Sequence, residues 1–297
     1  MIKMEIYEDG VAFSDDESYK IDERFLLKLV GIAKKVNRVK PKQDALFINE
    51  GKEGWGKTNS SIFEAAVLKE LTHRPIFLGF HLQTVREWAS THEDWIIIWD
   101  EPGLDSLSSD QVTNLNKDMQ RFFMMGRKKG HIYLLNWTRF WKFNEYLATD
   151  RGDGMIHMSN RMIGHFVYIP RKNFEKLWKD KKTKNQRNYN QYKRYGAYIP
   201  EVMEAHFDEL DITIEGKPHC TYKDYSDFKD KSINDIGQEK KNKTLIKTEE
   251  KLKKLRYQIS QIKSIPQREL AKLLEVEPRR LREWKNQEWA GGVSQWK

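Results

Sequence analysis

The sequence has one cysteine and no long run of apolar residues. Among its 297 residues only Cys220 can supply a thiolate, which excludes an intramolecular disulfide framework and any four-thiolate metal site. No apolar run approaches the roughly 18 residues of a membrane-spanning helix. The first ten residues, MIKMEIYEDG, lack the apolar region of a secretory signal. We therefore expect a soluble protein without a membrane partner, located in the cytoplasm, or in the host's cytoplasm if a virus or plasmid encodes it.

Acidic residues are too few to balance the basic ones, and the imbalance is uneven along the chain. Residues 240–297 carry 16 basic and 7 acidic side chains, and residues 171–195 carry 10 and 2. The rest of the chain holds 27 basic and 35 acidic side chains. Two basic segments attached to an acidic body favour a polyanionic partner such as DNA. A pair of solvated lysine-rich helices is the alternative.

Short apolar runs alternate with segments of helical periodicity. Runs at 45–48, 75–80, 95–99 and 132–135 are separated by predicted helices that include 57–71 and 109–125, and a further helix is expected at 21–36. Runs at 155–158 and 165–169 indicate a closing antiparallel pair. Buried strands separated by helices predict an α/β fold with a mainly parallel central sheet flanked by helices.

A glycine-rich segment follows the first of these runs. Residues 51–58, GKEGWGKT, match G-x-x-x-x-G-K-[ST] at every fixed position and open a predicted helix. Such glycines let backbone amides face phosphate groups, Lys57 can reach the β- and γ-phosphates, and Thr58 can bind Mg²⁺. A glycine-rich turn without a ligand is the alternative. The predicted nucleotide-binding residues are Gly51, Lys52, Glu53, Gly54, Trp55, Gly56, Lys57, Thr58 and Asn59.

Two carboxylates, Asp100 and Glu101, end the run at 95–99. Asp100 is placed to hold the Mg²⁺ water shell, and Glu101 to orient or deprotonate the attacking water. With the glycine-rich segment, the pair resembles the Walker A and Walker B motifs of P-loop NTPases. The glutamate is similar to that of the branch with an additional catalytic glutamate, which includes RecA-like, AAA+ and FtsK/HerA-like ATPases. The resemblance implies ATP hydrolysis with ATP and Mg²⁺ as ligands, Lys57 and Glu101 being catalytic.

The same resemblance implies two further contacts with the γ-phosphate. In this branch a polar residue at the end of the next strand senses that phosphate, and Asn136 or Thr138 matches the position. An ordinary strand-end asparagine is the alternative. An arginine from a neighbouring subunit is also implied, so we expect a homo-oligomer. The sequence does not choose among four arginines for this role; Arg151 is the one we select, and an ordinary surface arginine is the alternative for each. The candidates for this role are Arg127, Arg139, Arg151 and Arg161.

Two loop residues depart from the usual motif. Glu53 places a carboxylate inside the phosphate-binding loop, where it repels phosphate unless it points away or binds a cation. Trp55 precedes the last glycine, where a smaller residue is common. Both departures concern affinity for the nucleotide rather than the identity of the motif.

Residues 265–285 resemble a helix-turn-helix. The inner faces of its two predicted helices are apolar, with Leu270, Ala271, Leu274, Leu281 and Trp284. The predicted DNA contacts on the outer face of the second helix are Arg279, Arg280, Arg282 and Lys285. Glu275 stands at the turn, where glycine is common. A basic helical hairpin that packs in an oligomer is the alternative.

The other basic segment, 171–195, interleaves its cations with aromatic residues: Phe174, Trp178, Tyr189, Tyr192 and Tyr195. Cations can follow a nucleic-acid backbone while aromatic rings stack on unpaired bases. A lysine-rich connecting loop has the same composition. Contact with single-stranded or distorted DNA and a simple connection therefore both remain open for this segment.

The order of these elements gives four predicted segments. They are a lead-in and helix (1–40), an ATPase core (41–170), a basic aromatic-rich extension (171–236) and a helical domain (237–297). The core resembles FtsK/HerA-like and viral genome-packaging motors, so the leading hypothesis is an oligomeric, ATP-driven DNA translocation or packaging motor. It would act on duplex or single-stranded DNA. An AAA+-like replication initiator or helicase loader, and a nucleotide-gated DNA-binding regulator, are the alternatives.

Overall fold

The computed structural model describes residues 5–7, 10–12, 20–38, 42–100, 117–124, 126–143, 145–158, 165–186, 189–199, 207–232, 266–273 and 277–279. The chain divides into two compact units, Met1–Ile233 and Asn234–Lys297. Several predicted site residues lie outside the described residues: Glu101, Arg161, Arg280, Arg282 and Lys285. Within the described part of the chain, no helix is long and apolar enough to cross a membrane.

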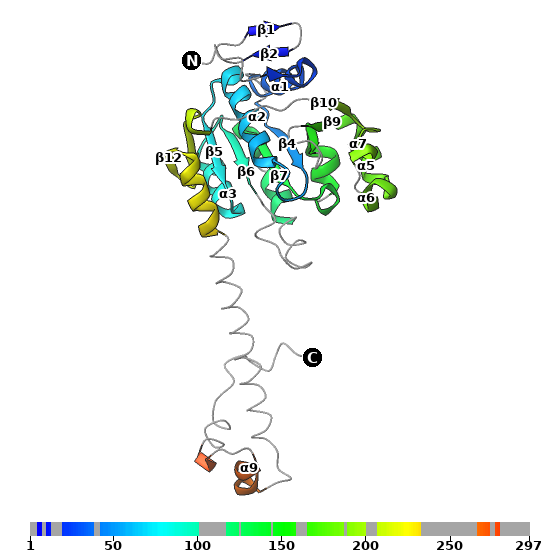
Figure 1. Cartoon of the computed structure of the whole chain (residues 1–297). Helices are drawn as coiled ribbons and strands as arrows, with labels where there is room; N and C mark the ends of the chain where they lie inside the picture. The colour runs from blue at the N-terminus through cyan, green and yellow to red at the C-terminus, as the bar shows by residue number, and fades with distance from the viewer. Residues whose placement is uncertain are drawn as a thin grey trace. The chain divides into compact units, whose positions relative to one another are not determined.

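The first unit is built on a nine-stranded sheet in the order β10-β9-β8-β4-β7-β6-β5-β11-β12 (Figure 1). All neighbours from β8 to β11 are parallel, whereas β9, β10 and β12 join by antiparallel pairing. The strands are β4 (Ala45–Glu50), β5 (Ile76–Gly79), β6 (Ile96–Trp99), β7 (Ile132–Trp137), β8 (Gly154–Met158), β9 (Phe166–Pro170), β10 (Ala197–Ile199), β11 (Ile212–Ile214) and β12 (Lys217–Cys220). The predicted α/β class with a mostly parallel sheet is confirmed, as is the closing antiparallel pair β8–β9.

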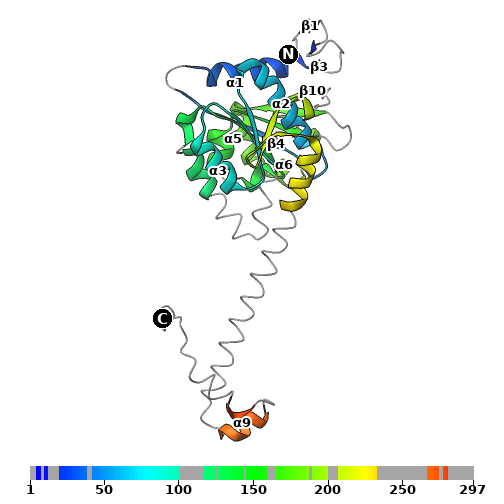
Figure 2. The same cartoon turned by 90° about the vertical axis from the view of Figure 1, so that its left-hand side faces the viewer.

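Helices cover both faces of this sheet, as the two views in Figure 1 and Figure 2 show. The described α-helices of this unit include α1 (Glu23–Val36), α2 (Lys57–Thr72), α3 (Leu82–Thr91), α5 (Phe174–Lys179), α6 (Lys181–Gln186) and α7 (Tyr189–Tyr192). Residues 117–124 and 222–232 are also helical. The shorter helical turns are η2 (Gly126–Lys129), η3 (Phe140–Lys142), η4 (Tyr146–Arg151), η5 (Arg171–Asn173) and η6 (Phe207–Glu209). A small separate sheet holds β1 (Glu5–Tyr7), β2 (Gly10–Ala12) and β3 (Lys20–Ile21).

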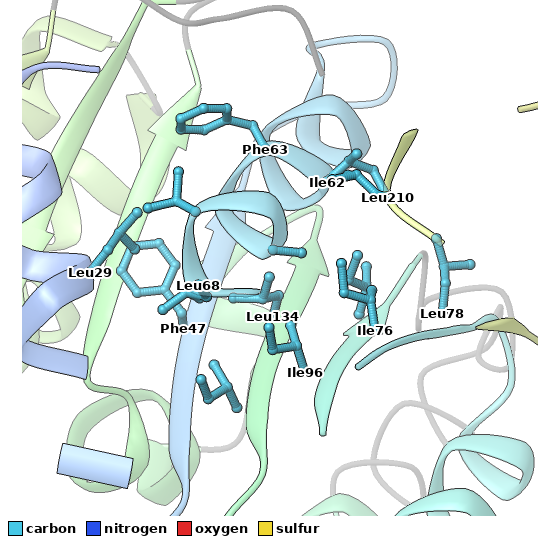
Figure 3. Packing of buried hydrophobic residues seen from close by; sticks show 14 of the residues in the cluster. Leu29, Phe47, Ile62, Phe63, Leu68, Ile76, Leu78, Ile96, Leu134 and Leu210 are labelled. Carbon is cyan, nitrogen blue, oxygen red and sulfur yellow. The ribbon is translucent and has the colours of Figure 1, made fainter. Parts of the chain in front are cut away.

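Alternation along each strand sorts the core into two apolar layers. On β4, Phe47 packs in the layer with α1 and α2, whereas Ile48 packs in the layer with α3 and α5. Figure 3 shows Phe47 between Leu29 of α1 and Leu68 of α2. Successive side chains of a strand point to opposite faces, so a continuous apolar run indicates burial on both sides. Full burial of a phenylalanine, leucine or isoleucine side chain stabilises the folded state by about 1.5–3 kcal/mol.

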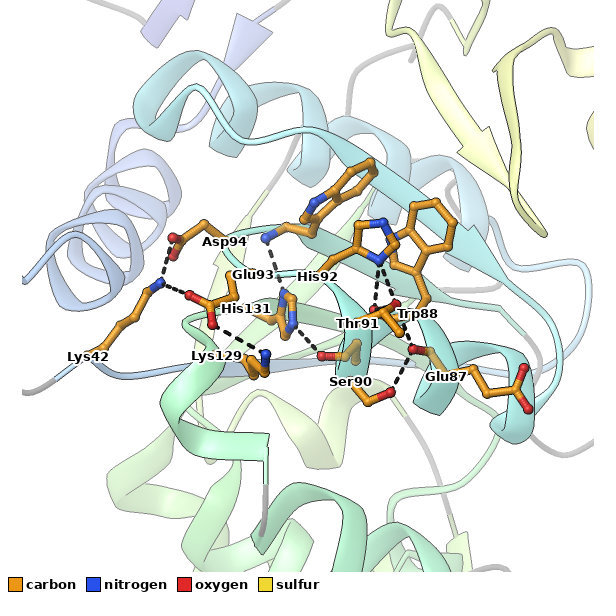
Figure 4. A network of polar contacts seen from close by, with 12 residues as sticks. Lys42, Glu87, Trp88, Ser90, Thr91, His92, Glu93, Asp94, Lys129 and His131 are labelled. Atoms are coloured by element: carbon orange, nitrogen blue, oxygen red, sulfur yellow. Dashed lines mark hydrogen bonds and ion pairs between the residues drawn. The ribbon is translucent and has the colours of Figure 1, made fainter.

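Polar contacts tie the loops at the amino-terminal edge of the sheet (Figure 4). Lys42 forms ion pairs with Glu93 and Asp94, with N–O distances of 2.9 and 2.7 Å. The buried ring of His131 accepts from the backbone N–H of Trp95 at 3.2 Å and donates to the carbonyl of Ala89 at 3.0 Å. Burial lowers the pKa of His131, which favours the neutral ring that these two bonds require. These contacts therefore hold the loops at this edge of the sheet to one another.

Arg151 lies at the same amino-terminal edge, three residues before the start of β8. Its side chain is 6% exposed, and its guanidinium pairs at 2.5 Å with Asp44, the residue before β4. The glycine-rich loop follows the opposite end of β4. An arginine that acts on a neighbouring subunit's nucleotide has to be exposed at the subunit surface. The predicted role of Arg151 does not fit this placement, and we leave Arg151 out of the proposed catalytic residues.

The basic segment 171–195 is part of the first unit and does not form a separate extension. Phe174 and Tyr192 are fully buried in the core layer below α5 and α7. The Tyr195 hydroxyl donates to Asp180 at 2.5 Å. The rings of Phe174 and Tyr192 fill the core and so cannot stack on bases, while contact of the rest of this segment with DNA stays an open possibility. The cations of this segment that the structure describes lie on the surface.

The described part of the second unit consists of α9 (Gln267–Leu273) and residues 277–279. Leu270 and Ala271 are buried, and Arg279 is exposed. The turn and most of the second predicted helix lie outside the described residues. The helix-turn-helix therefore stays a prediction.

The buried pair gives a direct stability test. Replacing Arg151 by Met leaves the Asp44 carboxylate buried without its partner, so we expect the free energy of unfolding to fall by about 3–5 kcal/mol. The double variant Arg151→Met, Asp44→Asn should recover part of this loss. Urea unfolding of the three proteins measures both changes. A loss below about 1 kcal/mol in the single variant would contradict the structural role.

Candidate nucleotide site

The loop from Gly51 to Gly56 connects the carboxyl end of β4 to the first turn of α2. Gly54 and Gly56 have φ angles of 74° and 85°, which side-chain-bearing residues rarely adopt. Gly56 is the N-cap of α2 but has no side chain to cap it, and the first turn contains no acidic residue. The N-cap therefore offers no side-chain acceptor to the backbone amides at the start of α2. An anion-binding helix end requires such amides to be open to the anion.

The loop side chains agree with this arrangement. Glu53 is exposed, which removes the objection that its carboxylate would repel phosphate inside the loop. Trp55 is half-buried and lies edge-on to the ring of His157, with centroids 6.1 Å apart. Lys57 is buried, and its ammonium donates to the carbonyl of Lys52 at 2.8 Å. Lys57 therefore folds back over the loop, while the Asn59 side chain is exposed.

Asp100 is the central acid of the site. It follows β6 and is fully buried, on the same face of the sheet as α2. Its carboxylate accepts from the Thr58 hydroxyl at 3.1 Å, the Asn136 amide at 2.7 Å and the Tyr225 hydroxyl at 2.8 Å. The predicted magnesium residues, Thr58 and Asp100, are thus brought together. Asn136 joins them because β7 lies between β4 and β6.

A buried chain of hydrogen bonds fixes the orientation of Asn136. The Asn49 amide donates to the Ser61 hydroxyl at 2.5 Å, and that hydroxyl donates to the side-chain oxygen of Asn136. The Asn136 nitrogen must then face Asp100. Asn49 also donates to Glu64 at 2.9 Å. Strand alternation explains why these side chains meet. Asn49, Asp100 and Asn136 each come two residues after a core position on the α2 face, so all three point to that face.

The residues present fit a magnesium ion bound together with phosphate groups. Thr58 and Asp100 supply the hard oxygen ligands that Mg²⁺ prefers. No group of three or more His, Cys, Asp or Glu side chains in the described ranges could hold a metal by itself. Mg²⁺ usually takes one or two protein ligands and completes its shell with water and substrate phosphates. The oxygens of Thr58 and Asp100, two protein ligands beside the glycine-rich loop, match that requirement.

Two of the residues around Asp100 could not be found from the sequence motif. Tyr225 and Lys229 belong to residues 222–232, far along the chain. The Lys229 ammonium lies 3.9 Å from the Asp100 carboxylate and donates to the Tyr225 hydroxyl at 3.2 Å. Burial, followed by the charge of Asp100, raises the pKa of Tyr225, so this phenol stays protonated and donates. Their i, i+4 spacing was the available signal, but nothing in it points to Asp100.

A second buried cluster supports the point where the loop leaves the sheet, on the face opposite α2. Glu50, the last residue of β4, hydrogen-bonds the imidazole of His157 on β8. The ring of Tyr192 stacks on that imidazole with centroids 3.5 Å apart, and its hydroxyl lies 3.4 Å from Glu50. All three side chains are buried. Glu50, the residue before Gly51, is thereby held by side chains from two other elements, β8 and α7.

No protein-family model matches the sequence, and no curated protein matches it. Among solved structures, the chain is similar to the N-terminal domain of zonular occludens toxin from Neisseria meningitidis. The two share 12% sequence identity, the match covers 57% of this chain and 98% of that one, and the TM-score is 0.34. A similarity of this degree carries no functional argument. The assignment therefore rests on the residues of the site.

Glu64 gives the site a testable pH dependence. Burial raises the pKa of this carboxyl to about 8 from an ordinary value of 4.5, although the bonds from Asn49 and Ser60 oppose the shift. Between these pH values the folded state binds more protons than the unfolded state, so this group lowers the free energy of unfolding as pH rises. The slope is at most about 1.4 kcal/mol per pH unit.

We therefore expect Glu64→Gln, which keeps a neutral amide in place, to flatten the decline in stability between pH 5 and pH 8. Chemical unfolding at four pH values in this range measures it. Parallel curves for the wild type and the variant would show that Glu64 is ionised in the fold.

Proposed function

We propose that this protein binds a nucleoside triphosphate, with ATP as the expected one, at residues 51–58 and hydrolyses it. The observation that carries the proposal is the meeting of Thr58, Asp100 and Asn136 beside the glycine-rich loop, at the carboxyl-terminal edge of a parallel sheet. Ligands of open α/β sheets bind outside the carboxyl ends of the strands. A glycine-rich turn without a ligand has no need for a buried acid connected to the adjacent helix and strand.

Each residue has a distinct part in this proposal. The loop amides and the Lys57 ammonium bind and orient the phosphates, and Thr58 and Asp100 hold Mg²⁺. When bound, Mg²⁺ supplies positive charge that offsets the negative charge of the phosphates. The Asn136 amide is held toward Asp100 and is the proposed contact to the γ-phosphate. Glu101 follows Asp100 directly in the sequence and is the proposed base for the attacking water.

We further propose that the protein handles DNA, as an oligomeric translocation or packaging motor. Support comes from charge, because the described cations of the 171–195 segment are all exposed: Arg171, Lys172, Lys176, Lys179, Lys181, Lys182, Lys184, Lys193 and Arg194. Exposed Arg279 and its neighbours Arg280, Arg282 and Lys285 form the proposed second contact. Clustered cations of this kind bind the phosphate backbone without regard to sequence.

The nucleotide proposal is tested by two substitutions with opposite signatures. Lys57→Ala should weaken binding of a fluorescent ATP analogue by at least tenfold, because it removes the buried ammonium from the loop. Glu101→Gln should retain nucleotide binding but lower kcat by roughly 100-fold or more. Lys28→Ala, on the exposed side of α1, is the control and should match the wild type. Equal ATP turnover in wild type and Lys57→Ala would exclude hydrolysis at this loop.

The DNA proposal is tested by the salt dependence of binding. Neutralising Lys181, Lys182 and Lys184 to Gln should weaken DNA binding and lower the slope of log K against log salt by up to about 3. The control triple, Lys28, Lys34 and Lys223 to Gln, removes the same charge from exposed positions outside this segment. Identical effects of the two triples would show only a net-charge effect. Comparing duplex and single-stranded DNA tests the expected partner in the same assay.

A further inference from the structure

Helical residues 222–232 contact the proposed magnesium site through one face. Tyr225 and Lys229 are four residues apart, so both project from the same side of the helix. The Tyr225 ring packs against Phe80 and Phe207, with centroids 5.8 and 5.5 Å away. This packing holds the phenol hydroxyl 2.8 Å from the Asp100 carboxylate. The helix is therefore anchored beside the acid by apolar contacts that do not depend on the nucleotide.

Lys229 brings a positive charge to the same carboxylate oxygen. Its ammonium lies 3.9 Å from Oδ2 of Asp100 and 3.2 Å from the Tyr225 hydroxyl oxygen, while its side chain is 26% exposed. A fully buried carboxylate is costly unless charge and hydrogen bonds compensate it. Lys229 supplies such charge from a position that it can leave, because its side chain still reaches solvent.

We propose that Lys229 is an internal counter-ion of Asp100 that competes with Mg²⁺, and that Tyr225 is the positioning residue that holds the ammonium there. The proposal rests on the nucleotide function proposed above and adds a regulatory part to the same site. Thr58 can donate its proton to Asp100 and still offer an oxygen lone pair to Mg²⁺. The Lys229 ammonium has no such compatibility, since two cations near one carboxylate repel each other.

The position of Tyr225 and Lys229 in the chain suggests what the competition between Lys229 and Mg²⁺ regulates. Residues 222–232 directly precede the boundary between the two compact units at Ile233 and Asn234. When Mg²⁺ and nucleotide bind, Lys229 leaves Asp100 and the helix loses a contact at its carboxyl-terminal half. The segment that leads into the second unit thus responds to the state of the nucleotide site.

The test measures binding of a fluorescent ATP analogue as a function of Mg²⁺ concentration, with no need for turnover. In Lys229→Met and Lys229→Gln we expect the half-saturating Mg²⁺ concentration to fall on the order of tenfold, a common size for coupling between two ligands. Binding without Mg²⁺, in EDTA, should stay unchanged. Lys229→Arg retains the charge and should stay within about twofold of the wild type. Lys223→Met, an exposed lysine of the same helix, is the matched control.

Tyr225→Phe tests the positioning role while keeping the ring in its apolar contacts. It should shift the Mg²⁺ dependence in the same direction, and the double variant Tyr225→Phe, Lys229→Met should equal Lys229→Met alone. The rise in melting temperature on adding Mg²⁺ and nucleotide should be larger in Lys229→Met than in the wild type. A purely structural role of Lys229 would lower all melting temperatures and leave this difference unchanged.

The possible failures are distinguishable. If nucleotide binds but Mg²⁺ dependence is the same in wild type, Lys229→Met and Lys229→Gln, the competition proposal is wrong and the nucleotide proposal stands. If Lys229→Met weakens binding in EDTA as well, Lys229 is a phosphate ligand and the competition proposal is again wrong. If the wild type binds no nucleotide and equals Lys57→Ala, the proposed function fails, and the proposal about Lys229 fails with it.

Discussion

The buried carboxylate of Asp100 is the group on which the rest of the site depends. Removing an ionised carboxyl from water costs several kcal/mol unless hydrogen bonds and charge replace its hydration. Three elements meet that cost here: α2 with Thr58, β7 with Asn136, and residues 222–232 with Tyr225 and Lys229. Thr58 and Asn136 reach Asp100 because β7 separates β4 from β6 and α2 crosses the same face.

The two edges of the sheet are built for different purposes. At the amino-terminal edge, polar groups pair with one another within the fold, as Lys42 does with Asp94 and Arg151 with Asp44. The carboxyl-terminal edge brings together the glycine-rich loop, the amino-terminal end of α2 and the hydrogen-bonded carboxylate of Asp100. Paired charges at the first edge stabilise the fold, whereas the second edge is the one where we propose that an anion and a cation bind together.

Local pattern was enough to predict most of the sheet and the central part of the site. Continuous apolar runs marked β4 to β7 because these strands are buried on both faces, and the loop motif with Asp100 indicated where the candidate site lies. Asn136 followed from its place at a strand end. Tyr225 and Lys229 could not be predicted, because their approach to Asp100 depends on how β11 and β12 extend the sheet. The burial of Arg151 and Tyr192 likewise depends on tertiary packing, which composition does not reveal.

The most direct test of the central claim is a crystal structure of the protein with Mg²⁺ and a non-hydrolysable ATP analogue. Our account predicts the β- and γ-phosphates inside the 51–56 loop, with the Lys57 ammonium turned from the Lys52 carbonyl to the phosphates. The metal should lie beside Thr58 and Asp100. A nucleotide bound elsewhere on the chain, with Lys57 still on the Lys52 carbonyl, would contradict the account.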